Sequence, residues 1–408
     1  MDNKKTKLYK AKILADQNLY KSVISINKSL EEESKNKEKD FLTFGVKNTV
    51  DIPKGLVDKL RKNSKYLFLT VDKMSHLGRS IDTDLVNPLT YRCMTGSSSG
   101  TAINILKGIN DFGIGTDGGG SVLAPALSTN LYSFIGSGVG LVTGKESLST
   151  DSISFTGGIG IISKNFPTLK NVVFDILDKE IQNDKIRNKE CNENDSDVLN
   201  KRKNINDTVL RIAIPKYNLI TLPDDVDMRA EIDNVISNLN KDKDFEDRLL
   251  KNELDSKNSN LLEEKVIKLE FIEYSFENIY ERNIAIKEIK NIFDNDVADI
   301  ILTYEGPIDI YGYDETIQRS FKGKAEKKIT SNGGKGIVKA INMCKCTGIT
   351  IPGEKLASGF VICAKEGIQG LINAFTLGQA IDECIEKNEM FNRYFIDREK
   401  FIDSINLD

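Results

Sequence analysis

One stretch of the sequence, Gly96 to Ala126, carries the residue types that serine chemistry needs. It opens with the triple serine 97–99 and leads through the glycine run 118–120 into Ser121. Consecutive glycines can turn several backbone N–H groups toward one point, and such a nest binds an anion or an oxyanion. A serine at the end of this nest could attack a carbonyl carbon whose oxygen the same loop then stabilises. A flexible Gly/Ser linker is the alternative, but the apolar run Ala102–Leu106 favours a buried loop.

A second stretch supplies a candidate base. Residues 41–50 predict a strand, and Lys47 is a single lysine among its apolar residues. Such a lysine either extends its amine to the solvent at a sheet edge or is buried for a reason. Burial disfavours the ammonium form and lowers the lysine pKa, so a buried Lys47 could act as a base.

These residues resemble the amidase signature family, which includes fatty acid amide hydrolase, malonamidase and the A subunit of glutamyl-tRNA amidotransferase. The resemblance rests on Gly-Ser-Ser-Ser-Gly at 96–100, Gly-Thr-Asp-Gly-Gly-Gly-Ser at 115–121 and Gly-Val-Lys-Asn at 45–48. The interval between the family's two functional serines matches Ser97 and Ser121. The resemblance implies that the catalytic residues are Lys47, Ser97 and Ser121. It also implies an oxyanion nest at Gly118, Gly119 and Gly120, and supporting roles for Ser98, Thr116 and Asp117. It implies neither a cofactor nor a metal.

The sequence departs from the family pattern at several places. Asn48 stands where an aspartate is usual, and Leu123 replaces the usual arginine after the nucleophile. The interval from Lys47 to Ser97 is also shorter than the family pattern, which predicts a trimmed cover over the site. The resemblance further implies a cis peptide at Ser97.

Other catalytic motifs in the sequence lack residues that their chemistry requires. Residues 96–100 also match the nucleophile elbow of α/β-hydrolases with Ser98 at its centre, but that fold needs a histidine after the serine. The only histidine is His76. Ser25-x-x-Lys28 lacks the partner motifs of penicillin-binding enzymes, and we interpret it as a chance match on a helix. Cys344-x-Cys346 is a weak metal motif, because none of the six cysteines has C-x-x-C spacing.

Composition limits the classes of function. The chain has 408 residues and a formal net charge of −4, which gives no basic footprint for nucleic acid. No apolar run is long enough to predict a membrane span, and no signal peptide is recognisable at the start. We therefore expect a cytoplasmic protein, with a possible homodimer or partner subunit.

Alternating patterns predict an α/β fold with a central mixed sheet covered by helices, as one domain over residues 1–408. The polar segment 182–207 predicts a mobile surface insertion. The expected strands are 41–50, 66–71, 112–115, 133–142, 153–163, 209–215, 266–270, 297–304, 348–352 and 359–365. The expected helices are 8–36, 56–63, 99–111, 165–180, 226–265, 279–293, 336–346 and 369–385.

The favoured function is an amidase that hydrolyses the carbon–nitrogen bond of a linear, small-molecule amide through an acyl-enzyme on Ser121, releasing ammonia or an amine. Two alternatives stay open. The chain could be the glutaminase subunit of a tRNA-dependent amidotransferase, or a catalytically silent relative used for binding.

The lone histidine gives a first prediction. No step of the expected chemistry uses His76, so His76→Gln should keep most of the amidase activity, measured as ammonia release. A loss of several orders of magnitude in a folded variant would restore the histidine mechanisms.

Overall fold

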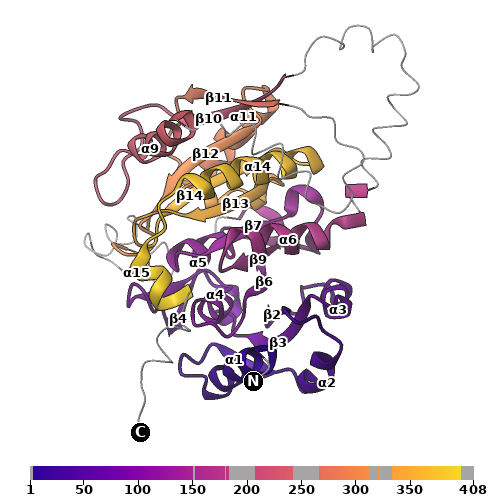
Figure 1. Ribbon diagram of the computed structural model, residues 1–408. Helices are drawn as coiled ribbons and strands as arrows, with labels where there is room; N and C mark the ends of the chain where they lie inside the picture. Colours follow the sequence, from indigo (N-terminus) through magenta and orange to yellow (C-terminus); the bar gives the residue numbers. More distant parts are fainter. Residues whose placement is uncertain are drawn as a thin grey trace.

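A large mixed β-sheet runs through the molecule and carries the other elements (Figure 1). The structure is a computed structural model that describes residues 3–149, 152–179, 181–182, 207–241, 266–312, 320–321, 323 and 333–396. It confirms the expected fold class, a single α/β domain with a central mixed sheet and surrounding helices. The predicted insertion at 182–207 lies, apart from its two end residues, outside the described residues.

The strands of the large sheet are β1 (Val23–Ile26), β2 (Leu42–Lys47), β3 (Tyr66–Asp72), β6 (Phe112–Asp117), β7 (Tyr132–Ile135), β8 (Val142–Leu148), β9 (Ser154–Ser163), β10 (Asp207–Pro215), β11 (Val266–Tyr274), β12 (Ile300–Glu305), β13 (Thr347–Pro352) and β14 (Gly359–Ala364). A separate hairpin-like sheet pairs β4 (Ile81–Val86) with β5 (Cys93–Thr95).

The α-helices are α1 (Asn3–Gln17), α2 (Leu30–Lys35), α3 (Lys54–Lys62), α4 (Ser99–Leu106), α5 (Leu123–Ser128), α6 (Phe166–Ile176), α9 (Met228–Lys241), α11 (Arg282–Asp294), α14 (Ile368–Cys384) and α15 (Glu389–Phe391). Short 3-10 turns are η1 (His76–Gly78), η2 (Ser137–Val139), η3 (Ile337–Lys339) and η4 (Asn342–Cys344), and η5 (Asn392–Ile396) is a π turn. Among the described residues, no helix is long and apolar enough to span a membrane.

The strand order is β1-β3-β2-β6-β9-β7-β13-β14-β12-β10-β11, with β8 paired to β9. The N-terminal elements therefore lie at one end of the sheet, and β10–β12 with α9 and α11 lie at the other (Figure 1). Between them, the late strands β13 and β14 join β7 to β12, and α14 packs against both of them. This order brings the last third of the chain beside the strands of the first third.

Strand β2 lies inside the sheet and is parallel to both of its neighbours, β3 and β6. Parallel strands are covered on both faces, which explains the nearly continuous apolar run that ends in Lys47. Every β2 residue after Leu42 is buried. Lys47, the last residue of this buried strand, is therefore buried as well.

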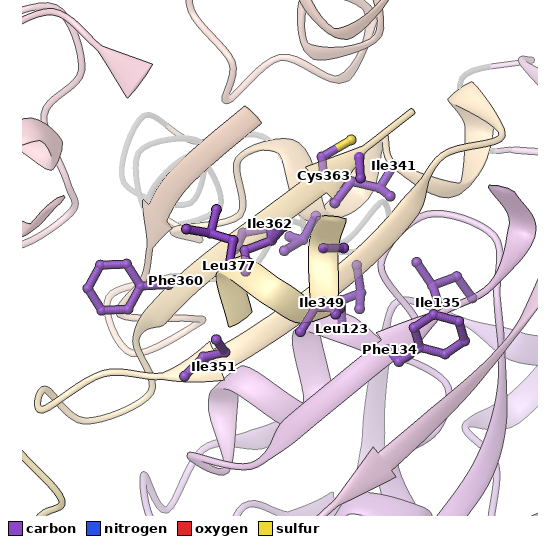
Figure 2. Packing of buried hydrophobic residues seen from close by; sticks show 14 of the residues in the cluster. Leu123, Phe134, Ile135, Ile341, Ile349, Ile351, Phe360, Ile362, Cys363 and Leu377 are labelled. Atoms are coloured by element: carbon purple, nitrogen blue, oxygen red, sulfur yellow. The ribbon is translucent and has the colours of Figure 1, made fainter. Parts of the chain in front are cut away.

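Leu123 belongs to the core rather than to the site surface. Its side chain is fully buried and lies in the cluster with Phe134, Ile135 and Ile349 (Figure 2). The position that carries an arginine in the family pattern therefore contributes apolar packing in this chain.

The single helix expected over residues 8–36 is wrong. Helix α1 ends at Gln17, and Asn18 and Lys21 adopt left-handed backbone conformations that no α-helix continues through. The Asn18 side chain bonds both the N–H and the C=O of Val23, at 3.0 and 2.8 Å. Residues 23–26 then pair with β3 as the sheet-edge strand β1, so Ser25 lies on a strand and not on a helix.

Three other expected elements are shorter or broken. The predicted strand 133–142 is divided by η2 and by Gly140, which has φ 78°. Helix α4 stops at Leu106 instead of 111, because Gly108 takes a positive φ and the chain turns toward β6. The predicted helix 336–346 is two 3-10 turns, η3 and η4, and Lys345 after the second turn takes a left-handed backbone conformation that ends it.

The burial of Leu123 yields a stability prediction. Leu123→Arg would place an unpaired charge in the core, so we expect a loss of roughly 3 kcal/mol or more in the free energy of unfolding. Denaturant unfolding measures this loss, with Leu19→Arg at an exposed position as the control. Equal unfolding midpoints for the two variants would contradict the core assignment.

Candidate active site

The site forms where β2 and β6 end side by side. The two strands are parallel neighbours, with Val46 opposite Ile114, so their carboxyl ends meet at the same sheet edge. Ligand sites of open α/β sheets lie at such edges. Lys47 is the last residue of β2, and the glycine run 118–120 follows β6 directly.

Lys47 is buried and its amine has three polar neighbours. Its Nζ lies 2.7 Å from Ser97 Oγ, 2.8 Å from Thr116 Oγ1 and 3.1 Å from the Thr116 carbonyl oxygen. Burial lowers the pKa of Lys47 from its usual value to about 7, against the opposing effect of the carboxylates of Asp117 and Asp51. A substantial fraction of the amine is therefore neutral near neutral pH.

The Asp117 carboxylate folds the glycine loop. It accepts the N–H groups of Gly120 and Val122, both at 2.6 Å, and that of Leu123 at 3.4 Å. Burial raises the Asp117 pKa above its usual range, while these backbone donors oppose the rise. Gly120 has φ 93°, a conformation that favours glycine.

One N–H group of the expected oxyanion nest, that of Gly120, is already used within this turn. The Gly120 N–H is directed to Asp117, so it is not available to a substrate oxygen. The N–H groups of Gly119 and Ser121 have no hydrogen-bond partner among the described residues. Both residues, together with Gly118, are partly exposed toward the cavity.

Close packing explains one glycine of the loop, Gly118. A Cβ atom on Gly118 would lie 2.5 Å from the Phe155 ring, which no structure tolerates without movement. A Cβ on Gly119 would lie 3.5 Å from Arg282 Nη2 and from Met343 Cε, which is an ordinary van der Waals distance, so these side chains border the loop without requiring glycine there. The nest therefore has a wall on each side, one from β9 and one from the last third of the chain.

Ser97 and Ser121 face one cavity of about 790 Å³. Their segments are joined by the Ser98 N–H, which donates to the Ser121 carbonyl at 3.1 Å. Among the described contacts, no hydrogen bond links the two hydroxyl groups. The lining includes Lys47, Thr49, Asp51, Met74, Leu77, Arg79, Ser97, Thr116, Asp117, Gly118, Gly119, Ser121, Lys145, Phe155, Tyr280, Glu281, Arg282, Lys339 and Met343.

The expected supporting residues lie around this cavity in different ways. Thr116 contacts the Lys47 amine through its hydroxyl and its carbonyl. Ser98 is fully buried, and its hydroxyl has no hydrogen-bond partner within the described part of the chain. A Cβ on Gly115 would meet that hydroxyl at 2.5 Å, so the glycine makes room for Ser98.

The structure also separates some residues from the site. His76 is exposed and does not line the cavity, and Asn48 is exposed beyond the end of β2. Within the described ranges, no group of histidine, cysteine or carboxylate side chains has a metal-binding arrangement. The cis peptide expected at Ser97 is wrong, since the one cis bond among the described residues is Gly306–Pro307.

The wall from the last third of the chain was missed by sequence reasoning. Asn342 Nδ2 donates to the Gly118 carbonyl at 3.2 Å, and the backbone at Val338 and Lys339 packs against Gly119 and Gly120. Strand β12 ends in Glu305, a fully buried carboxylate that accepts the N–H groups of Gly336 at 2.5 Å and Val338 at 3.3 Å. A glutamate ending an apolar strand was a signal that could have indicated a structural carboxylate.

Comparison with known proteins places this geometry in a family. The family model described as Amidase matches residues 83–297, more than half of the chain. The chain belongs to the amidase family. The matched range contains Ser97, Ser121 and the glycine loop, while Lys47 precedes it. No curated protein matches the sequence of this amidase-family chain.

Solved structures agree with the fold. An amidase family protein from Bacillus anthracis str. Ames is 14% identical with a TM-score of 0.55, over 94% of this chain and 88% of that one. A 6-aminohexanoate cyclic dimer hydrolase complexed with substrate is 12% identical with a TM-score of 0.52, over 93% of each chain. An allophanate hydrolase of Kluyveromyces lactis is 13% identical with a TM-score of 0.52, over 94% of this chain and 71% of that one. Family membership supports hydrolysis of carbon–nitrogen bonds in general.

The Glu305 contacts generate a prediction. Glu305→Gln replaces one acceptor oxygen with a donor that faces backbone N–H groups, so the turn at 336–340 should shift against the glycine loop. We expect the rate at which a fluorophosphonate labels Ser121 to fall about tenfold. The buried carboxylate Glu288 provides the control variant Glu288→Gln. Identical labelling rates for the two variants would show that Glu305 does not position the loop.

Proposed function

We propose that this protein is an amidase that uses Lys47, Ser97 and Ser121 to hydrolyse a small linear amide through a serine acyl-enzyme. The observation that carries the proposal is the contact between the buried Lys47 amine and the Ser97 hydroxyl, at 2.7 Å. Ser121 lines the same cavity beside backbone N–H groups that have no other acceptor among the described residues. This combination supports a base, a relay and a nucleophile without a histidine.

The first step is activation of the nucleophile. Neutral Lys47 uses its N–H groups on the two oxygen atoms of Thr116 and accepts the Ser97 proton with its lone pair. Ser97 in turn accepts the proton of Ser121 as the Ser121 oxygen attacks the amide carbon. The Ser97 and Ser121 hydroxyls must come into contact for this transfer, and such contacts often tighten only when substrate is bound.

The second step is stabilisation of the tetrahedral intermediate. The negative charge that develops on the carbonyl oxygen is held by the N–H groups of Gly119 and Ser121. The Asp117 carboxylate contributes indirectly, because its bonds to the Gly120 and Val122 N–H groups fix the turn that aims the other donors. The reaction therefore uses the N–H groups of Gly119 and Ser121, while the N–H group of Gly120 holds the loop closed.

The remaining steps return the protons. Lys47 and Ser97 pass a proton to the departing nitrogen, the carbon–nitrogen bond breaks, and ammonia or an amine leaves. Water then attacks the ester on Ser121 and gives its proton to Ser97 and Lys47. The ester bond breaks, the carboxylic acid leaves, and Ser121 recovers its hydrogen.

The pKa of Lys47 sets the pH profile of this reaction. Below about 7 the amine becomes protonated and cannot accept the Ser97 proton, so kcat/KM should rise through this pH and then level. Lys47→Ala should lower the activity at least a hundredfold, and the ionisation near 7 should disappear from the pH profile. Lys47→Arg should also fail, because a guanidinium stays protonated. A near-normal rate and profile for Lys47→Arg would place the base elsewhere.

The nucleophile is tested by covalent labelling. A fluorophosphonate should attach to Ser121, and mass spectrometry of the digested protein locates the adduct. Ser121→Ala should abolish labelling, while Ser98→Ala provides a control within the same cluster of serines. An adduct on residues 97–99 with Ser121 unmodified would reject the assignment.

A further inference from the structure

The charged side chains of the cavity are biased toward cations. Besides Lys47, the lining contains Arg79, Lys145, Arg282 and Lys339. The acidic lining residues are Asp51, Glu281 and Asp117, and the last of these is occupied by three backbone donors. A cavity lined in this way favours an anionic occupant over a cationic one.

One of these cations lies directly beside the nest. Arg282 Nη2 is 3.5 Å from the position that a Cβ on Gly119 would occupy, and Gly119 is one of the two proposed oxyanion donors. Arg282 is partly buried and begins helix α11, so its backbone is fixed by regular structure. The segment before it is held as well, because the Lys339 amine donates to the Tyr280 carbonyl.

Two of the other cations, Lys339 and Lys145, are less suited to contact a small substrate at the nest. Lys339 is buried and already donates to a backbone carbonyl. Lys145 is exposed on β8, so solvent screens its charge. Of these three cations, Arg282 combines a place in the cavity wall with a charged group that closely approaches the glycine loop.

We propose that Arg282 binds a carboxylate of the substrate, so that the preferred substrates are amides that also carry a carboxylate. A guanidinium forms paired hydrogen bonds with a carboxylate, which fixes orientation as well as supplying affinity. With the amide oxygen at Gly119 and Ser121, a carboxylate a few carbon atoms away reaches Arg282. Phe155 and Met343 flank the loop and contact the intervening methylene groups. This inference deepens the proposed amidase function and rests on it for turnover, but not for binding.

The test measures binding without turnover. Ser121→Ala is titrated with two pairs of probes, succinamate against butanamide and glutaramate against pentanamide, in which a methyl group replaces the carboxylate. Charge-assisted hydrogen bonds predict that the anionic member of at least one pair binds roughly ten- to a hundredfold more tightly. Equal affinities within both pairs overturn the inference, whatever the turnover of the wild-type enzyme.

Variants assign the preference to Arg282. Adding Arg282→Gln to Ser121→Ala should remove most of the preference for the anionic probe, while Arg282→Lys should keep part of it because the charge remains. The matched control is Lys145→Gln, which removes an exposed lining cation and should change the preference less. Circular dichroism checks the fold of each variant. A preference that survives Arg282→Gln overturns the assignment, whatever the effect of Lys145→Gln.

Turnover separates this inference from the proposed function. Wild-type protein that binds succinamate or glutaramate selectively but releases no ammonia from it refutes the amidase proposal and leaves the carboxylate site standing. Protein that hydrolyses both members of each pair with equal kcat/KM retains the amidase proposal and refutes the carboxylate site.

Discussion

The site depends on one buried amine. Strand β2 carries Lys47 into the interior, and the contacts with Ser97 and Thr116 satisfy its nitrogen there. Burial is the main cause of its low pKa, and the nearby carboxylates limit the shift so that the amine titrates near 7. A lysine at a solvent-exposed sheet edge would stay protonated, and the same three residues would have no base. In the proposed mechanism, the parallel pairing of β2 with β3 and β6 is therefore needed for the chemistry as well as for the fold.

A second constraint is that some N–H groups of the glycine loop bind the Asp117 carboxylate and others do not. The Asp117 carboxylate uses the Gly120 and Val122 N–H groups to close a tight turn, which leaves the Gly119 and Ser121 donors directed elsewhere. The outer side of this turn is supported by η3, and η3 is held by the buried carboxylate of Glu305. Two buried carboxylates thus fix the backbone around the loop, and in the proposed mechanism this preorganises the donors that would stabilise the oxyanion.

The residues proposed to carry the chemistry could be singled out from the sequence because their signals are local. Lysine in an apolar strand and serine after consecutive glycines are recognisable within a few positions. The opposite wall could not be predicted, because it depends on the strand order that brings β13 beside β7. Asn342 meets Gly118 only through this long-range pairing. The error over residues 8–36 has a local cause: apolar periodicity continued past Asn18 and Lys21, whose backbone conformations end the helix.

The central claim is that Lys47 titrates near neutral pH, so that a substantial fraction of its amine is neutral in the resting enzyme, and this ionisation can be observed directly. Carbon-13 at the lysine Cε position allows the Lys47 resonance to be followed by NMR during a pH titration and assigned by comparison with Lys47→Ala. The account predicts a midpoint near 7 for this resonance, while exposed lysines titrate at about 10.4. A Lys47 midpoint at the value of the exposed lysines would contradict the account, because the proposed base would then be protonated at neutral pH.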